Sequence, residues 1–242
     1  MTAGLSAQPH SLILTAHGSV DPRSAAVTHA MAGRIRRLRP GLDVQVAFLE
    51  RSAPTLADVL DTTTRGVVVP FLLADAYHAS VDIPAVIEAS GRMVRQAAVL
   101  GEDPALLTVL RHRLAEAGAS PTDRGLGVVV VAVGSSDAHA NQRTATVASA
   151  LAAGTRWTGT EVALATGPRP NLDDAVGELR GRGAQRVMIA PWFLAPGRIT
   201  DRVSEFAARQ GLPMSEPLGS HNLVAATVLD RFDDVAATRI AA

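Results

Sequence analysis

Three side chains that could hold a metal ion follow apolar segments in the first third of the chain. His17 comes directly after the apolar run 12–16, Glu50 directly after 44–49, and His78 shortly after 67–73. Such runs are typical of buried parallel strands, and the carboxyl ends of parallel strands meet at one edge of a sheet, where ligands bind. Two imidazoles and one carboxylate suit Fe²⁺, Co²⁺, Ni²⁺ or Zn²⁺ and leave coordination positions open. We therefore expect His17, Glu50 and His78 to converge on one metal-handling site.

The composition excludes several other chemistries. The 242 residues include no cysteine, and all 23 basic residues are arginine, so thiolate metal sites, disulfides and lysine Schiff bases are excluded. The 23 acidic residues balance the basic ones, which indicates neither a nucleic-acid partner nor an anionic membrane partner. No apolar run reaches roughly 18 residues, and Met1–His10 lacks the features of a signal peptide. We expect a cytoplasmic protein.

The elements that must position the three side chains alternate between strands and helices. The predicted order is a strand at 12–16, a helix at 23–38, a strand at 44–49, a helix at 52–60, a strand at 67–73 and a helix that opens at 83. This alternation is typical of α/β proteins with a parallel sheet and right-handed crossovers.

The second half of the chain repeats the first. With Gly134 placed on Gly18, the segment 134–137 matches 18–21, and with small gaps 191–195 matches 70–74. The period of about 116 to 121 residues is too long for a solenoid. It predicts two similar lobes, residues 1–119 and 125–242, each a parallel β-sheet flanked by helices in a flavodoxin-like arrangement, with the site in the cleft between them.

The repeat also distinguishes residues that serve the fold from residues that are candidates for function. Positions that match between the lobes are mostly glycines, prolines and strand residues, as expected of residues kept for the fold. Opposite the three candidate ligands, the second half has Val133, Thr166 and, near the place of His78, Gly197. Because all three ligands are lost together, they are expected to act as one functional group, with the second lobe forming a wall of the cleft.

The first lobe resembles the sirohydrochlorin chelatases. The resemblance lies in His17-Gly18-Ser19-x-Asp21-Pro22-Arg23, in the strand Val46–Glu50, and in the segment 69–73 that leads to His78 and Asp82-Ile83-Pro84. These class II chelatases insert cobalt or ferrous iron into a tetrapyrrole without ATP. The resemblance implies a chelatase-like fold, with His17 and His78 handling the metal and Glu50 as the acidic partner. One departure is the loop 74–77, which is usually rich in glycine.

A tetrapyrrole substrate is a flat macrocycle fringed with carboxylates. A cleft with apolar walls and arginines at its rim would suit it. The candidates for substrate binding are Arg23 and Arg198 for carboxylates, Tyr77 for stacking and Ser19 as a loop hydroxyl or helix cap. The divalent metal, Fe²⁺ or Co²⁺, is then a substrate, no cofactor is permanently bound, and we expect a monomer.

Several alternatives remain open. Iron insertion, giving sirohaem, is the favoured activity, while cobalt insertion for cobalamin biosynthesis is the alternative. A tetrapyrrole or metal carrier without turnover is a further alternative. A histidine phosphatase is disfavoured because Ala16 stands where that family has an arginine. A serine hydrolase is disfavoured because the chain has no Gly-x-Ser-x-Gly elbow.

Overall fold

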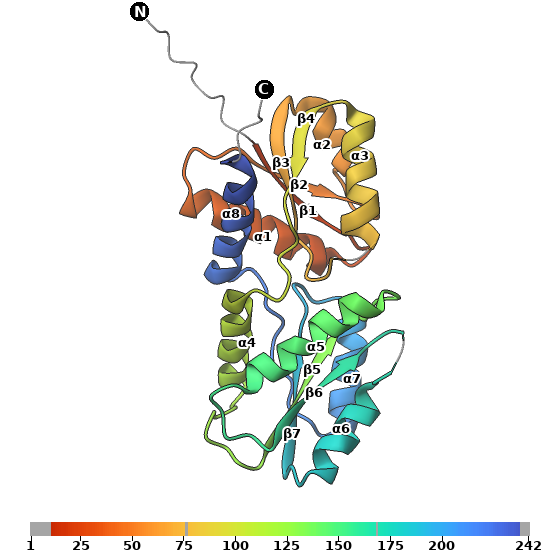
Figure 1. Ribbon diagram of the computed structural model, residues 1–242, viewed down its shortest axis with the longest axis vertical. Helices are drawn as coiled ribbons and strands as arrows, with labels where there is room; N and C mark the ends of the chain where they lie inside the picture. Colours follow the sequence, from red (N-terminus) through yellow and green to blue (C-terminus); the bar gives the residue numbers. More distant parts are fainter. Residues whose placement is uncertain (1–10, 76, 168, 238–242) are drawn as a thin grey trace, which may run out of the picture.

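Two lobes, each built on a parallel sheet, lie one above the other along the long axis of the molecule (Figure 1). The computed structural model describes residues 11–75, 77–167 and 169–237. The segment Met1–His10, for which no signal peptide is predicted, lies outside the described residues. Among the helices of the described residues, none has the length and apolar character needed to cross a membrane. The predicted α/β class with two parallel sheets flanked by helices is confirmed.

The first lobe has a four-stranded sheet. Its strands are β1 (Ser11–Ala16), β2 (Val44–Phe48), β3 (Arg65–Pro70) and β4 (Met93–Gln96), in the order β2-β1-β3-β4 and all parallel. Its connections contain α1 (Pro22–Leu38), α2 (Leu56–Thr62), the π-helical turn η1 (His78–Asp82) and α3 (Ile83–Ser90). In the strand register, Ala16 pairs with Phe48 and Thr15 with Pro70. The carboxyl ends of β1, β2 and β3 therefore meet at one edge.

The second lobe repeats this plan with three strands. They are β5 (Leu126–Ala132), β6 (Gly159–Leu164) and β7 (Arg186–Pro191), parallel and in the order β6-β5-β7. The helices of this lobe are α5 (Ala138–Ala152), α6 (Leu172–Gly181) and α7 (Arg198–Gln210). At the place of the fourth strand, an isolated parallel bridge joins Ile189 to Met214.

Aspartates at the N-termini of α1 and α5 fix where these two helices begin. Asp21 caps α1, with Pro22 in the first turn, and Asp137 caps α5 in the same way. An N-cap oxygen satisfies a backbone N–H that the helix itself leaves unpaired. Ser19 is not the helix cap, because its Oγ accepts a hydrogen bond from the backbone N–H of Asp21 instead. The turn that follows β1 is thus held by the side chains of Ser19 and Asp21.

The last helix of each repeat packs against the other lobe. The helix α4 (Pro104–Glu116) contacts α5 and β7, whereas α8 (Asn222–Ala236) contacts α1 and β3. Figure 1 shows α8 beside α1 in the upper lobe and α4 beside α5 in the lower one. The predicted boundaries, 1–119 and 125–242, follow the repeat in the sequence, while each sheet is covered on one side by a helix from the other repeat.

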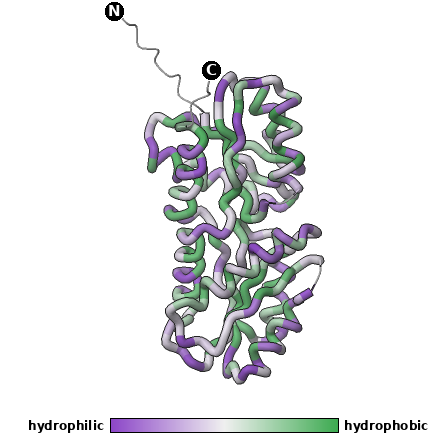
Figure 2. Tube along the Cα trace, in the orientation of Figure 1, coloured by the Kyte–Doolittle hydropathy of each residue, from purple (hydrophilic) through white to green (hydrophobic). Residues whose placement is uncertain are grey.

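This exchange of helices joins the two lobes through one core. A single cluster of buried apolar side chains runs from Leu12 in the first sheet to Val130 in the second and includes Phe232 of α8. Smaller cores lie on the opposite faces, against α2 and α3 in the first lobe and against α6 and α7 in the second. Figure 2 shows the apolar strands at the centre of both lobes. The extensive shared core holds the lobes at a defined distance across the cleft.

One predicted strand is shorter in the structure. The apolar run 67–73 is expected to be a single strand, but β3 ends at Pro70. Phe71 still donates its backbone N–H to Thr15, and the chain then leaves the sheet so that Leu72 and Leu73 line a cavity between the lobes. Apolar character alone does not distinguish a buried strand from the apolar wall of a cleft.

Candidate metal centre

The three predicted ligands lie together at the carboxyl edge of the first sheet. His17 directly follows β1, Glu50 lies two residues after β2, and His78 begins η1. One ligand atom from each residue can be chosen so that all three lie within 4.8 Å of one another. The predicted convergence is therefore observed, whereas the role of each residue stays a prediction. The set has the composition and spacing of a site for one divalent ion.

The closest pair in this cluster is His17 with Glu50. The Nε2 atom of His17 lies 3.1 Å from Oε1 of Glu50, and the two side chains are each 43% exposed. Donor atoms at this separation can bind the same ion, whose bonds to nitrogen and carboxylate oxygen are about 2.0–2.2 Å long.

A glycine makes this approach possible. Gly18 has a φ of +91°, and a Cβ atom at this position would lie 1.7 Å from the carbonyl oxygen of Glu50. The backbone N–H of Glu50 donates to the carbonyl of His17 over 3.0 Å, so the loops after β1 and β2 are joined directly. Only glycine permits both this left-handed conformation and this contact.

The second histidine is oriented by a carboxylate one turn further on. The Nδ1 atom of His78 lies 2.6 Å from Oδ2 of Asp82. A carboxylate at Nδ1 favours the tautomer with the proton on that nitrogen, which leaves the lone pair of Nε2 free for a metal. The rings of His17 and His78 lie 4.4 Å apart, centre to centre. Asp82 belongs to the motif that resembles the chelatases, but the sequence does not reveal its contact with His78.

The surroundings of His17 favour the neutral imidazole. Burial, the largest effect, and then the positive charge of a protonated His78 lower the pKa of His17, and Arg51 lowers it further. Glu50 and Asp82 act in the opposite direction but do not outweigh burial. A neutral imidazole can coordinate a metal, whereas a protonated one cannot.

Two cavities between the lobes adjoin the metal cluster, and His17 lines both of them. The first has a volume of about 460 Å³. It is lined by His78 and Tyr77 of the first lobe, and by helix α5 and the loop that follows β5 in the second lobe. The second, of about 420 Å³, is lined by the loop after β1 and by the start of α7. Phe71, Leu72, Val133, Phe193 and Leu194 contribute to both. The cleft therefore has the apolar walls that a flat macrocycle would need.

The four predicted substrate-binding residues lie in different surroundings. Tyr77 is 64% exposed and lines the first cavity, with its ring edge-on to His78. Ser19 and Arg198 line the second cavity. Arg23 is instead held by two carboxylates, Asp21 at 2.5 Å and Asp201 of α7 at 2.5 Å.

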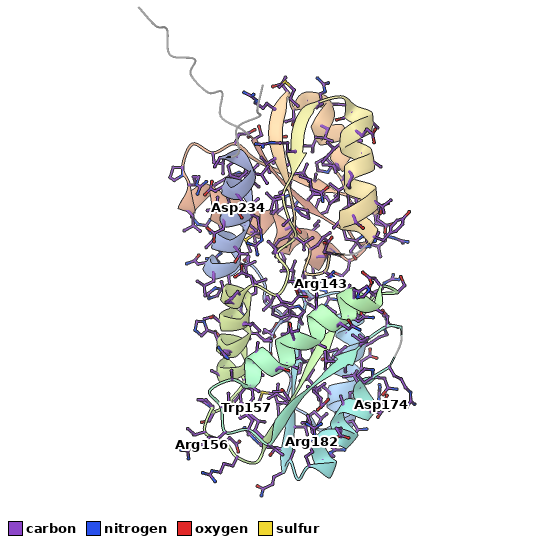
Figure 3. The ribbon with its side chains drawn as sticks, in the orientation of Figure 1. Arg143, Arg156, Trp157, Asp174, Arg182 and Asp234 are labelled. Carbon is purple, nitrogen blue, oxygen red and sulfur yellow. The ribbon has the colours of Figure 1, made fainter. Side chains whose placement is uncertain are left out.

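The pairing of Arg23 with Asp201 joins the two lobes. On the other side of the cleft, Arg143 of α5 donates to the backbone carbonyl of Asp75 over 2.8 Å. Figure 3 shows Arg143 where α5 lies close to the first lobe. The structure thus gives Arg23 an interlobe partner, and its contact with a substrate carboxylate stays a prediction.

Comparisons with known proteins agree with this architecture. The CbiX family model matches residues 11–117 and again residues 127–235, which also marks the repeat. A sirohydrochlorin cobaltochelatase of Priestia megaterium is 28% identical over 214 residues, covering 81% of this chain and 67% of the relative. A sirohydrochlorin ferrochelatase of the same bacterium is 27% identical over 184 residues, covering 71% and 69%.

A solved structure shows the same two-lobe fold. SirB from Bacillus subtilis with Fe³⁺ superimposes with a TM-score of 0.81 at 21% identity, covering 95% of this chain and 96% of that chain. The family model accounts for nearly all of the described residues. The chain therefore belongs to the CbiX family, the sirohydrochlorin chelatase family that the motifs of its first lobe resemble.

Proposed function

We propose that the protein inserts ferrous iron into sirohydrochlorin, with the metal as a substrate and with no permanently bound cofactor. The observation that carries the proposal is the cluster of His17, Glu50 and His78, whose ligand atoms lie within 4.8 Å of one another beside cavities between two lobes. The relatives from Priestia megaterium are named for insertion of cobalt and of iron into this same macrocycle.

The chemistry of insertion matches what these side chains can do. A divalent ion enters the macrocycle as two pyrrole N–H protons leave, so the site must hold the ion loosely and accept protons. His17 and His78 present the ion with open coordination positions, because two imidazoles and one carboxylate do not fill an octahedral shell. The Glu50 carboxylate ligates the ion or takes up a proton as the pyrrole nitrogens replace the protein ligands.

The second lobe contributes binding rather than a second metal centre. At the places of the three ligands it has Val133, Thr166 and, near His78, Gly197. Val133 and Phe193 line both cavities and offer apolar surface to a macrocycle. Since one chain supplies both walls of the cleft, a monomer is sufficient for activity; light scattering coupled to gel filtration tests this part of the proposal.

Anaerobic assays with sirohydrochlorin test the activity and the metal. Purified protein is mixed with Fe²⁺ or Co²⁺, and the spectrum of the macrocycle is followed against a control without protein. The expected result is many turnovers per protein molecule, faster with iron than with cobalt. Faster insertion of cobalt would support the second candidate, a cobaltochelatase, which the relative at 28% identity favours. One product per protein molecule would indicate a carrier.

A further inference from the structure

An arginine beside the metal cluster adopts a backbone conformation that favours glycine. Arg51 has a φ of 59°, and among the described residues other than glycine it alone has a positive φ. A left-handed conformation costs free energy for any residue with a Cβ atom, and such residues gather at functional sites. The position of Arg51, directly after Glu50, calls for an explanation beyond the turn itself.

The repeat provides the comparison. The turn after β6 matches the turn after β2: Thr166 donates to Val133 over 2.8 Å, as Glu50 donates to His17 over 3.0 Å. The residue that follows Thr166 is Gly167, with a φ of +89°. The fold thus requires a left-handed residue at this point in both lobes. Glycine meets the requirement without strain in the second lobe, whereas the first lobe carries an arginine despite the strain.

The guanidinium of Arg51 is fixed at one end and open at the other. Its Nε lies 3.3 Å from Oε2 of Glu50, which leaves Oε1 of that carboxylate directed at His17. Across the described residues, the terminal amines of Arg51 form no hydrogen bond or ion pair with the protein, and the side chain is 60% exposed. A guanidinium held through Nε can still bind a carboxylate with both terminal amines.

The surroundings of Arg51 are suited to an anion. Arg51 lines the second cavity together with Arg198, the first residue of α7, and with Ser19. At the start of α1, Arg23 is paired with two carboxylates, whereas Arg51 is paired with one and through Nε alone. Arg51 and Arg198 therefore supply positive charge to a cavity whose other walls are largely apolar.

We propose that Arg51 binds a carboxylate of the macrocycle in the second cavity and thereby places the macrocycle over the metal held by His17 and Glu50. This inference rests on the proposed function, since it takes a carboxylate-bearing tetrapyrrole as the ligand. It explains why the first lobe has arginine where the repeat has glycine. The contact of Nε with Glu50 couples substrate binding to the position of a metal ligand.

The test compares Arg51→Gly and Arg51→Lys with the wild type. The dissociation constant of sirohydrochlorin is measured without metal by absorbance, and KM, kcat and the melting temperature are measured in parallel. For Arg51→Gly we expect affinity to fall and KM to rise at least tenfold, with a smaller change in kcat, because a uniform binding contact is lost. Its melting temperature should stay constant or rise by about 2–4 °C, because strain is relieved. Arg51→Lys keeps the positive charge but not the two terminal amines that bind a carboxylate together, so its affinity should lie between those of Arg51→Gly and the wild type.

A matched control lies in the second lobe. Gly167→Ala places a Cβ atom in the same left-handed turn, with open space around it, and should lower the melting temperature without changing sirohydrochlorin affinity. A tetrapyrrole esterified at its carboxylates should bind equally to the wild type and to Arg51→Gly.

Wild-type affinity in Arg51→Gly would overturn the proposal, as would an equal loss of affinity for the esterified macrocycle. A marked fall in its melting temperature would assign Arg51 a structural role instead. If the wild type binds sirohydrochlorin but inserts no metal, the proposed function fails while the binding comparison still decides on Arg51.

Discussion

Replacing Gly18 with alanine should disable the metal centre through the backbone alone. The new Cβ atom would lie 1.7 Å from the carbonyl oxygen of Glu50, while contacts of real Cβ atoms are essentially never shorter than 3.0 Å. The Gly18 loop and the Glu50 carbonyl must therefore move apart by about 1.3 Å, whereas metal–ligand distances vary by only about 0.2 Å. Gly134, its counterpart in the second lobe, is the control, because there a Cβ atom would lie 2.2 Å from the carbonyl oxygen of Thr166.

The expected loss in the free energy of unfolding of Gly18→Ala has three contributions. The left-handed conformation, with a φ of +91°, costs alanine about 1–2 kcal/mol. The moving loop also weakens two backbone hydrogen bonds, from Leu49 to Ala16 and from Glu50 to His17, each worth about 1 kcal/mol. The sum is about 3–4 kcal/mol, or a melting temperature lower by about 6–16 °C for a chain of this size. The Gly134 variant should lose a similar amount, since its φ is +93°.

The assay separates stability from metal binding. Thermal unfolding gives the melting temperature, and titration with Co²⁺ in the absence of a tetrapyrrole gives the metal affinity of the folded protein. We expect Gly18→Ala to lose at least about tenfold in Co²⁺ affinity, as when the support of a metal ligand is removed. Gly134→Ala should keep wild-type affinity despite its lower stability. Equal Co²⁺ affinities in the two variants would refute the reasoning.

Three further predictions concern the histidines and their support. Replacing His17 or His78 with alanine should lower metal insertion by orders of magnitude while the far-ultraviolet circular dichroism stays unchanged, because both side chains are 43% exposed and contribute little to the core; near-normal turnover would argue against the ligand assignment. Asp82→Asn removes the carboxylate that orients His78 and should weaken Co²⁺ binding about 10- to 100-fold, with Asp58→Asn, at an exposed helix start, as a control for surface charge. Because burial lowers the pKa of His17, the NMR titration of this histidine in the metal-free protein should have a midpoint below 6.5. The neutral imidazole of His17 therefore contributes to stability above pH 6.5, and this contribution is lost as the pH falls toward the folded-state pKa. A midpoint above 6.5 would show that Glu50 outweighs burial.

The placement of the metal cluster was predictable from the sequence. Apolar runs that end at His17 and Glu50 predict strands, and parallel strands with right-handed crossovers bring their carboxyl ends to one edge. The repeat then distinguished residues that serve the fold from candidate functional residues, because Gly134 matches Gly18 whereas Val133 stands in place of His17. These inferences succeed because they depend on local patterns and on a topology with few alternatives.

Other features of the site arise only when distant segments meet. The pairing of Arg23 with Asp201 joins residues 178 positions apart, and it depends on the relative orientation of the lobes, which the exchange of α4 and α8 sets. Leu72 lines the cleft rather than extending a strand, since its surroundings come from both lobes. Spacing alone does not specify such contacts.

The left-handed backbone of Arg51 depends on both the sequence and the tertiary structure. The sequence determines that arginine stands where the repeat has Gly167, but it does not reveal the φ of 59° at that position. The tertiary structure decides it, because the turn after β2 must bring the Glu50 backbone against Gly18 while the chain continues toward α2. Hydrogen bonds and close packing with the loop after β1 impose the conformation, and the local preference of arginine yields to them.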